Sequence, residues 1–111
     1  MNRTLFYILS ALLITQATSS AAVYKGQRIY VKECRHCHGG GQQLAESKNM
    51  RDWRHFMKNK GEHLADIHLK SEKAKESWDY FSSSKFTKKA KHLKDFLVEY
   101  AKDSGKVPAC N

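Results

Sequence analysis

The stretch Cys34-Arg35-His36-Cys37-His38 decides how the rest of this chain is interpreted. On a helical turn, residues at positions i, i+3 and i+4 lie on one face, so both thiols and the imidazole of His38 point to the same side. Two cysteines at this spacing, followed at once by histidine, form the attachment signature of c-type haem. The thiols can add to the two haem vinyl groups while the histidine reaches the iron. We therefore expect one covalent haem c held by Cys34 and Cys37, with His38 as the proximal iron ligand.

Three other interpretations of this motif are a thiol redox pair, half of a zinc site, and a chance occurrence. A zinc finger needs two further Cys or His residues at finger-like spacing. A thioredoxin-type pair opens a helix after a strand in a βαβ unit. The sequence shows neither context, so the haem interpretation is preferred.

The beginning of the chain has the composition of an export signal. A basic residue near the start precedes a short apolar core over 5–14, and small residues end the segment at Ala22. An uncleaved membrane anchor is the alternative, but the apolar run is shorter than the roughly 20 residues that a bilayer-spanning helix needs. We therefore predict a cleaved signal peptide over 1–22, a mature domain over 23–111, and a periplasmic location.

The 111-residue chain would retain about 90 residues after cleavage, which is enough for one small domain with a thin core. An apolar haem at the centre would compensate for the limited burial. Removing residues 1–22 deletes Arg3 and no acidic residue, so the formal net charge falls from +9 to +8. Such a basic monomer suits redox protein partners with acidic docking surfaces, or peripheral contact with an anionic membrane. A lysine-rich surface that only confers solubility explains the charge equally well, and export argues against nucleic acid as a partner.

The spacing of apolar residues predicts about four helices and no strand. The expected helices cover 24–38, 50–57, 62–81, and a segment from a capping Thr87 to the Ser104-Gly105 pair. Breaks are expected at 39–41, 59–61 and 82–84, where glycine, asparagine or serine residues interrupt the pattern. The three glycines at 39–41 would also leave room beside a bulky group. We therefore predict an all-α, compact bundle around the haem.

A second pattern lies outside the motif. Gly26 and Tyr30 precede Cys34 by eight and four residues, and Leu97 and Tyr100 stand three residues apart near the other end of the chain. Together with the CxxCH motif, this pattern resembles the small bacterial class I cytochromes c, monohaem proteins whose last helix crosses the first at such residues. A glycine at a crossing lets two helix backbones approach closely, which gives the resemblance a packing reason.

A looser resemblance covers the whole domain. The stretch KHLKDFL over 91–97 and the Pro-x-Cys end over 108–110 are similar to short cytochromes c of epsilon-class proteobacteria. The resemblance implies a periplasmic carrier of single electrons whose iron cycles between ferric and ferrous states, with no substrate and no catalytic acid or base. The alternative function is a haem-based sensor or small-gas-binding protein with an open sixth coordination position.

The chain departs from the pattern of the class I cytochromes c at two points, and these departures leave the identity of the sixth iron ligand open. The family's distal methionine lies in a loop shortly before the last helix, whereas residues 79–92 contain no methionine. The family's proline carbonyl that accepts a hydrogen bond from the proximal imidazole is also missing, since Pro108 is the only proline and lies near the other end of the chain. The candidates for the sixth ligand are His68, Met57, Met50 and His63. His68 shares the inward stripe of the predicted helix over 62–81, whereas His63 is rotated away, and an open site remains an alternative.

Cys110 is the one cysteine of the chain that the expected haem attachment does not use. An odd thiol in an exported protein is typical of an intermolecular disulfide or of a free reactive group. A spectator role in the chain end is equally well supported, and a tail that docks over the haem edge is a further option.

Overall fold

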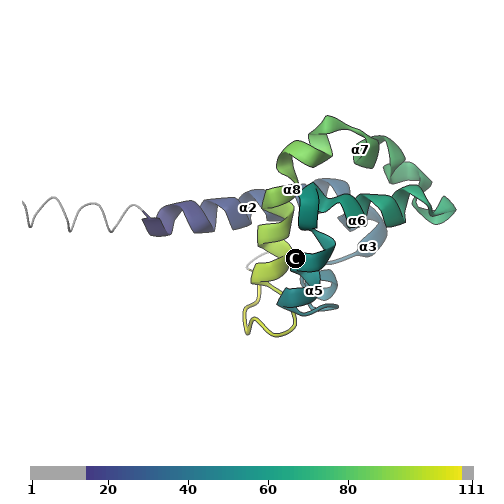
Figure 1. Cartoon of the computed structure of the whole chain (residues 1–111). Helices are drawn as coiled ribbons and strands as arrows, with labels where there is room; N and C mark the ends of the chain where they lie inside the picture. Colours follow the sequence, from purple (N-terminus) through teal and green to yellow (C-terminus); the bar gives the residue numbers. More distant parts are fainter. Residues whose placement is uncertain (1–14, 109–111) are drawn as a thin grey trace, which may run out of the picture.

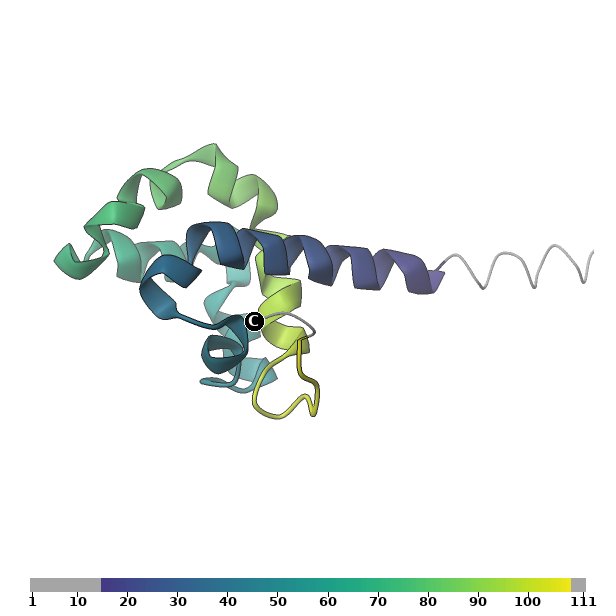
Figure 2. The same ribbon diagram turned by 180° about the vertical axis from the view of Figure 1, so that it is seen from behind.

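The computed structural model describes residues 15–108, and in that range the regular elements are all helical. In chain order they are α2 (Thr15–Glu33), α3 (Arg35–His38), α4 (Gly41–Ala45), α5 (Met50–Phe56), α6 (Lys58–Leu69), the 3-10 helix η1 (Glu72–Ser77), α7 (Trp78–Ser82) and α8 (Ser84–Glu99). Figure 1 shows α2 projecting from a bundle of the other helices, and Figure 2 shows the same arrangement from behind. The all-α prediction is confirmed, although the described range holds seven α-helices where about four are expected.

The predicted signal peptide falls mostly outside the described residues. This applies to residues 1–14, and Cys110 is likewise outside. Helix α2 begins at Thr15 and continues through the expected cleavage position after Ala22. Between residues 15 and 108, none of the helices combines the length and the apolar content that a bilayer crossing requires.

The crossing of α2 and α8 is the most extensive helix pair in the described range. The backbones come closest at Gly26, where an added Cβ would overlap the carbonyl oxygen of His92 and lie 2.7 Å from the Cβ of Phe96. Tyr30 packs against Phe96 with ring centroids 5.6 Å apart. The predicted crossing of the first and last helices is therefore confirmed. The contact at Gly26 itself is made by His92 and Phe96, which precede the expected Leu97 by five residues and by one residue.

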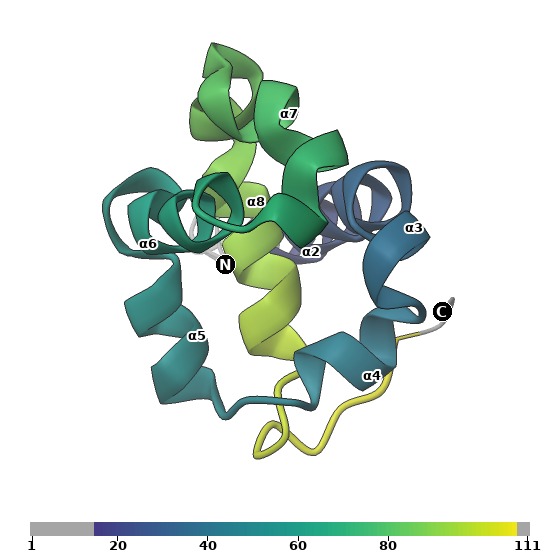
Figure 3. The same ribbon diagram turned by 90° about the vertical axis from the view of Figure 1, so that its right-hand side faces the viewer.

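The core gathers around α8. Its larger buried side chains are Tyr30, Trp53, Met57, Phe81, Phe86, Leu93, Phe96 and Leu97. In Figure 3, α3 and α4 lie on one side of α8, and α5 and α6 lie on the other. Helix α8 contributes the central apolar stripe, and α4, α5 and α6 pack against it.

The predicted first helix over 24–38 is present but bends at Cys34, which separates α2 from α3. The backbone hydrogen bonds continue through the bend, because the amide of Cys34 donates to the carbonyl of Tyr30 (2.8 Å) and the amide of His38 donates to the carbonyl of Cys34 (3.0 Å). The motif therefore keeps helical spacing, as its interpretation requires.

The glycine run interrupts the helix for two residues only. Gly39 has a positive φ of 73°, and Gly41 already begins α4. A Cβ added at Gly41 would lie 2.9 Å from Cζ of Phe96 and 3.2 Å from Cδ1 of Tyr30. The room that Gly41 provides thus serves the packing of Tyr30 on Phe96.

The sequence predicts one continuous helix over 62–81, and this prediction is wrong. Helix α6 ends at Leu69, Ser71 is extended (φ −107°, ψ 119°), and the chain continues through η1 and α7. The indole N–H of Trp78 donates to the carbonyls of His68 (2.9 Å) and Ser71 (3.2 Å). These bonds join the start of α7 to the end of α6, where the two carbonyls also accept backbone amides.

Two other breaks lie where the sequence places them. Asn59, Lys60 and Gly61 have positive φ values of 52°, 58° and 75°, which separates α5 from the helical part of α6. Ser83 is extended and precedes α8. The prediction that Thr87 caps this helix is wrong, because α8 begins at Ser84 and the hydroxyl of Thr87 donates to a carbonyl inside the helix.

Candidate functional site

A cavity of about 470 Å³ lies between α3 and α4 on one side and α6, η1 and α7 on the other. Leu93 and Leu97 of α8 line it from within the core. Apolar pockets of about 300–1,000 Å³ are typical of cofactor and ligand sites. The inward stripe predicted over 62–81 contributes most of its residues to the cavity despite the break in its helix. Leu64, Ile67, His68, Ser71, Ala74 and Phe81 line the cavity, whereas Trp78 does not.

The three motif residues that bear chemistry, Cys34, Cys37 and His38, all line this cavity. Cys34 is half-buried and Cys37 is exposed. Burial, with smaller contributions from the nearby Glu33 and Cys37, raises the pKa of the Cys34 thiol to about 12. Cys34 is therefore a neutral thiol at physiological pH.

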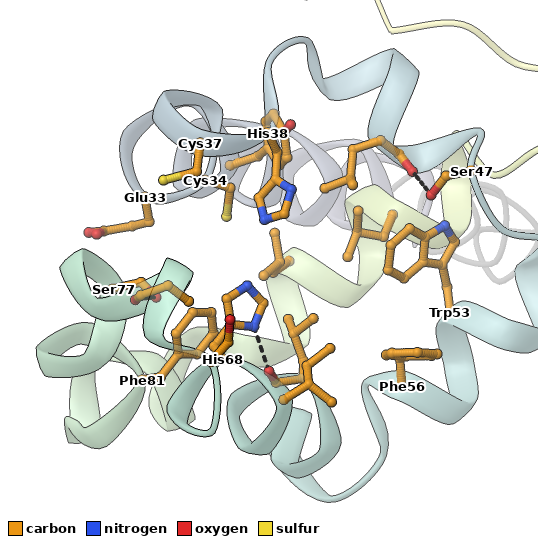
Figure 4. Close-up of a pocket in the computed structure, with 18 of the residues that line it drawn as sticks. Glu33, Cys34, Cys37, His38, Ser47, Trp53, Phe56, His68, Ser77 and Phe81 are labelled. Atoms are coloured by element: carbon orange, nitrogen blue, oxygen red, sulfur yellow. Dashed lines mark hydrogen bonds between the residues drawn. The ribbon is translucent and has the colours of Figure 1, made fainter.

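His68 lies on the opposite wall in a fixed orientation. Its Nδ1 is 2.7 Å from the carbonyl oxygen of Leu64, and since a carbonyl can only accept, Nδ1 carries the proton. The ring also stacks on Phe81, with centroids 4.3 Å apart and planes 28° apart. The unprotonated Nε2 is thereby left available to a metal, and Figure 4 shows His68 and His38 facing each other across the cavity.

The centroids of the His38 and His68 rings are 5.9 Å apart, and their planes are inclined at 72°. Two imidazoles that bind one metal ion from opposite sides, with metal–nitrogen bonds of about 2.0–2.1 Å, have ring centroids about 6 Å apart. Loss of water from the partly buried ring lowers the pKa of His38, and His68 lowers it further. Both effects favour the neutral imidazole, which is the form that binds metals.

The donor set fits a group that brings its own equatorial ligands. Among residues 15–108, no cluster of three or more His, Cys, Asp and Glu side chains is arranged to hold a bare metal ion. A haem would supply its own nitrogen ligands to the iron and leave the remaining ligands to the protein, and two of the described imidazoles, those of His38 and His68, line this cavity. The two thiols on the same wall as His38 complete the set that a c-type haem requires.

The other candidates for the sixth ligand lie outside the cavity. Met57 is buried beside Gly61, and Met50 is half-buried, with its amide donating to Asp103 (2.8 Å). His63 packs edge-on against Phe56, with ring centroids 4.7 Å apart. Neither methionine lines the cavity, nor does His63.

His63 also belongs to a second histidine pair. Its ring lies 6.2 Å from that of His55, a separation close to that of His38 and His68. Both of these histidines are exposed, and they line a different, open depression without a cysteine. Spacing alone therefore does not distinguish the two pairs, whereas the apolar cavity and its two thiols do.

Two hydrogen bonds support the walls of the cavity, and the CxxCH motif does not predict either of them. The hydroxyl of buried Tyr30 donates to the carbonyl of Gly39 (2.7 Å), which holds the peptide that follows His38. The bond from Trp78 to the carbonyl of His68 holds the other wall. Both aromatic residues belong to apolar stripes in the sequence, but their hydrogen bonds join segments nine and ten residues apart.

Comparison with family models, with curated proteins and with solved structures found no match to this chain. The resemblance to class I cytochromes c thus rests on the quoted residues alone. Any assignment of function therefore depends on the cavity and on four of the side chains that line it: Cys34, Cys37, His38 and His68.

Proposed function

We propose that this protein is an exported c-type cytochrome that binds one covalent haem and carries single electrons between redox partners. The observation that carries the proposal is the cavity in which His38 and His68 face each other at a ring distance of 5.9 Å, beside Cys34 and Cys37. When bound, the haem supplies one-electron chemistry through its ferric and ferrous states.

Each of the four residues has a separate task in this proposal. The thiols of Cys34 and Cys37 would add across the two vinyl groups of the haem, so that each sulfur would gain a bond to carbon and each thiol hydrogen would pass to the neighbouring carbon. His38, on the same helical turn, would bind the iron. His68 would be the second protein ligand of the iron, and its hydrogen bond to the carbonyl of Leu64 fixes the direction of its ring.

The alternative of a gas-binding sensor is not favoured by this geometry. A sensor needs an open sixth position, whereas the stack on Phe81 and the bond to Leu64 hold the ring of His68 facing His38. A ring that is already positioned loses little conformational entropy when it binds. An external gas would therefore have to displace a pre-oriented ligand.

The two other interpretations of the motif are also less well supported. A catalytic thiol pair needs a lowered cysteine pKa, because the thiolate is the reactive species, whereas burial raises the pKa of Cys34 to about 12. A structural zinc ion takes about four protein ligands, and the described residues offer no such cluster.

The basic surface gives a proposal for the partner. Helix α8 carries Lys85, Lys88, Lys89, Lys91 and Lys94. Where α8 meets α2, the pKa of His92 is lowered, mainly by burial and further by Lys25, Lys91 and Lys89. Concentrated positive charge of this kind accelerates association with an acidic redox protein and is screened by salt.

Covalent attachment is the direct test of this function. The protein, exported from cells with a cytochrome c maturation system, should show the mass of the processed chain plus one haem. Its reduced pyridine adduct should report two thioethers. Cys34→Ser and Cys37→Ser should each leave one thioether, because each removes one sulfur, whereas Cys110→Ser is a matched control that should leave both.

Acidified organic solvent should leave the haem on the wild-type protein. Extraction of the haem into that solvent, or a processed chain without haem, would show that the cysteines do not attach it and would contradict the proposed function.

A further inference from the structure

We propose that Lys48 binds the propionate carboxylates of the haem, at the end of the cavity opposite Cys34 and Cys37. This inference rests on the proposed function, because it concerns the orientation of the same cofactor. It assigns a binding role to a residue outside the CxxCH motif and outside the set of iron ligands.

Lys48 lies in the turn between α4 and α5 and lines the cavity. Its Nζ is 4.6 Å from the ring centroid of Phe56 and 5.9 Å from that of Trp53, so these two rings hold the ammonium group near the cavity. The residue is half-buried, and it forms no ion pair with any residue between 15 and 108. A partly desolvated cation of this kind favours a carboxylate as its partner.

The thiols determine which edge of the haem reaches Lys48. In Figure 4, Cys34 and Cys37 lie at one end of the cavity, and Trp53 and Phe56 lie at the other. A c-type haem carries its thioether carbons on one side and its two propionates on the opposite side. Attachment at the cysteines therefore directs the propionates toward the end where Lys48 contacts both rings.

Other polar hydrogens at this end are already used within the protein. The indole N–H of Trp53 donates to the carbonyl of Ala45 (2.7 Å), and the hydroxyl of Ser47 donates to the carbonyl of Leu44 (2.6 Å). The ammonium group of Lys48 is consequently the side-chain donor best placed to meet the carboxylates.

Lys73 is the second lysine that lines the cavity, and it provides a matched control. It belongs to η1, whose Ser77 lies toward the thiol end of the cavity in Figure 4. Replacing Lys48 or Lys73 by glutamine removes the same charge from the same cavity. Only the first replacement removes the cation that faces the propionates.

The test uses the matured holoprotein and two readouts other than activity. In Lys48→Gln, the propionate-bending band of the resonance Raman spectrum should shift to lower frequency, because its hydrogen bond is lost. The midpoint potential should fall below that of the wild type, since an uncompensated carboxylate near the iron favours the ferric state. Lys48→Arg should restore both properties, and Lys73→Gln should leave the Raman band in place.

An unchanged Raman band in Lys48→Gln, with haem attached as in the wild type, would overturn this inference and leave the proposed function standing. The same band shift in Lys73→Gln would also overturn it, because the effect would then be one of general charge. Absence of covalent haem from the wild-type protein would overturn both proposals together.

Discussion

Replacing His68 by alanine is expected to convert a six-coordinate, low-spin haem into one with an open sixth position. His68 is the only described imidazole that faces His38 within the cavity, at a ring distance of 5.9 Å. Electron paramagnetic resonance of the oxidised variant should therefore show a high-spin signal in place of the low-spin one. The reduced variant should bind carbon monoxide, which the wild type should exclude.

The two methionines provide the controls for this prediction. Met50 and Met57 lie outside the cavity, so Met50→Leu and Met57→Leu should keep the wild-type spectrum. If His68→Ala kept its low-spin signal while a methionine variant lost it, the sixth ligand would be sulfur. A higher reduction potential would then be expected, because methionine ligation raises it.

Gly26→Val is expected to reduce the free energy of unfolding by about 3 kcal/mol, at the upper end of the range for overpacked cores. The added side chain would meet the backbone of His92, which cannot move aside as a flexible side chain can. The α2–α8 crossing would have to open, and a small domain has few other contacts to compensate. Chemical denaturation of the matured holoprotein measures this loss.

Arg28→Val is the matched control, because it places the same β-branched residue on the exposed face of the same helix. It should change the free energy of unfolding by less than about 1 kcal/mol. Equal denaturation midpoints for Gly26→Val and the wild type would show that the two helices do not approach at Gly26.

The helical class of the fold could be predicted from the sequence, but the path of the chain could not. The apolar stripe over 62–81 has the period of one helix, yet the chain breaks after Leu69. Its later members return to the same cavity through η1 and α7. The hydrogen bond from the indole of Trp78 to the carbonyl of His68 stabilises this path. A hydrogen bond between a side chain and a backbone carbonyl ten residues away is not predicted by any local sequence pattern.

The candidate site was predictable where its residues are adjacent in sequence. Cys34, Cys37 and His38 share a helical turn, so their common direction follows from helix geometry alone. The sixth ligand required knowledge of how helices far apart in the chain face each other. Of the four candidates that the sequence offers, His68, Met57, Met50 and His63, the fold places only His68 on the cavity.

The position of Lys48 was even less predictable from the sequence than the sixth ligand. Its place beside Trp53 and Phe56 depends on the turn between α4 and α5, and the sequence there shows one lysine among many. Its half-buried position beside two aromatic rings becomes visible only in the folded chain.

The absorption spectrum of the matured protein, recorded in both oxidation states and into the far red, tests whether the protein holds a haem c with His38 and His68 as iron ligands. We expect the bands of a low-spin haem c with two histidine ligands, and no far-red band from sulfur-to-iron charge transfer. A far-red sulfur band would contradict the assignment of His68. A spectrum without haem bands would contradict both the proposed function and the role of Lys48.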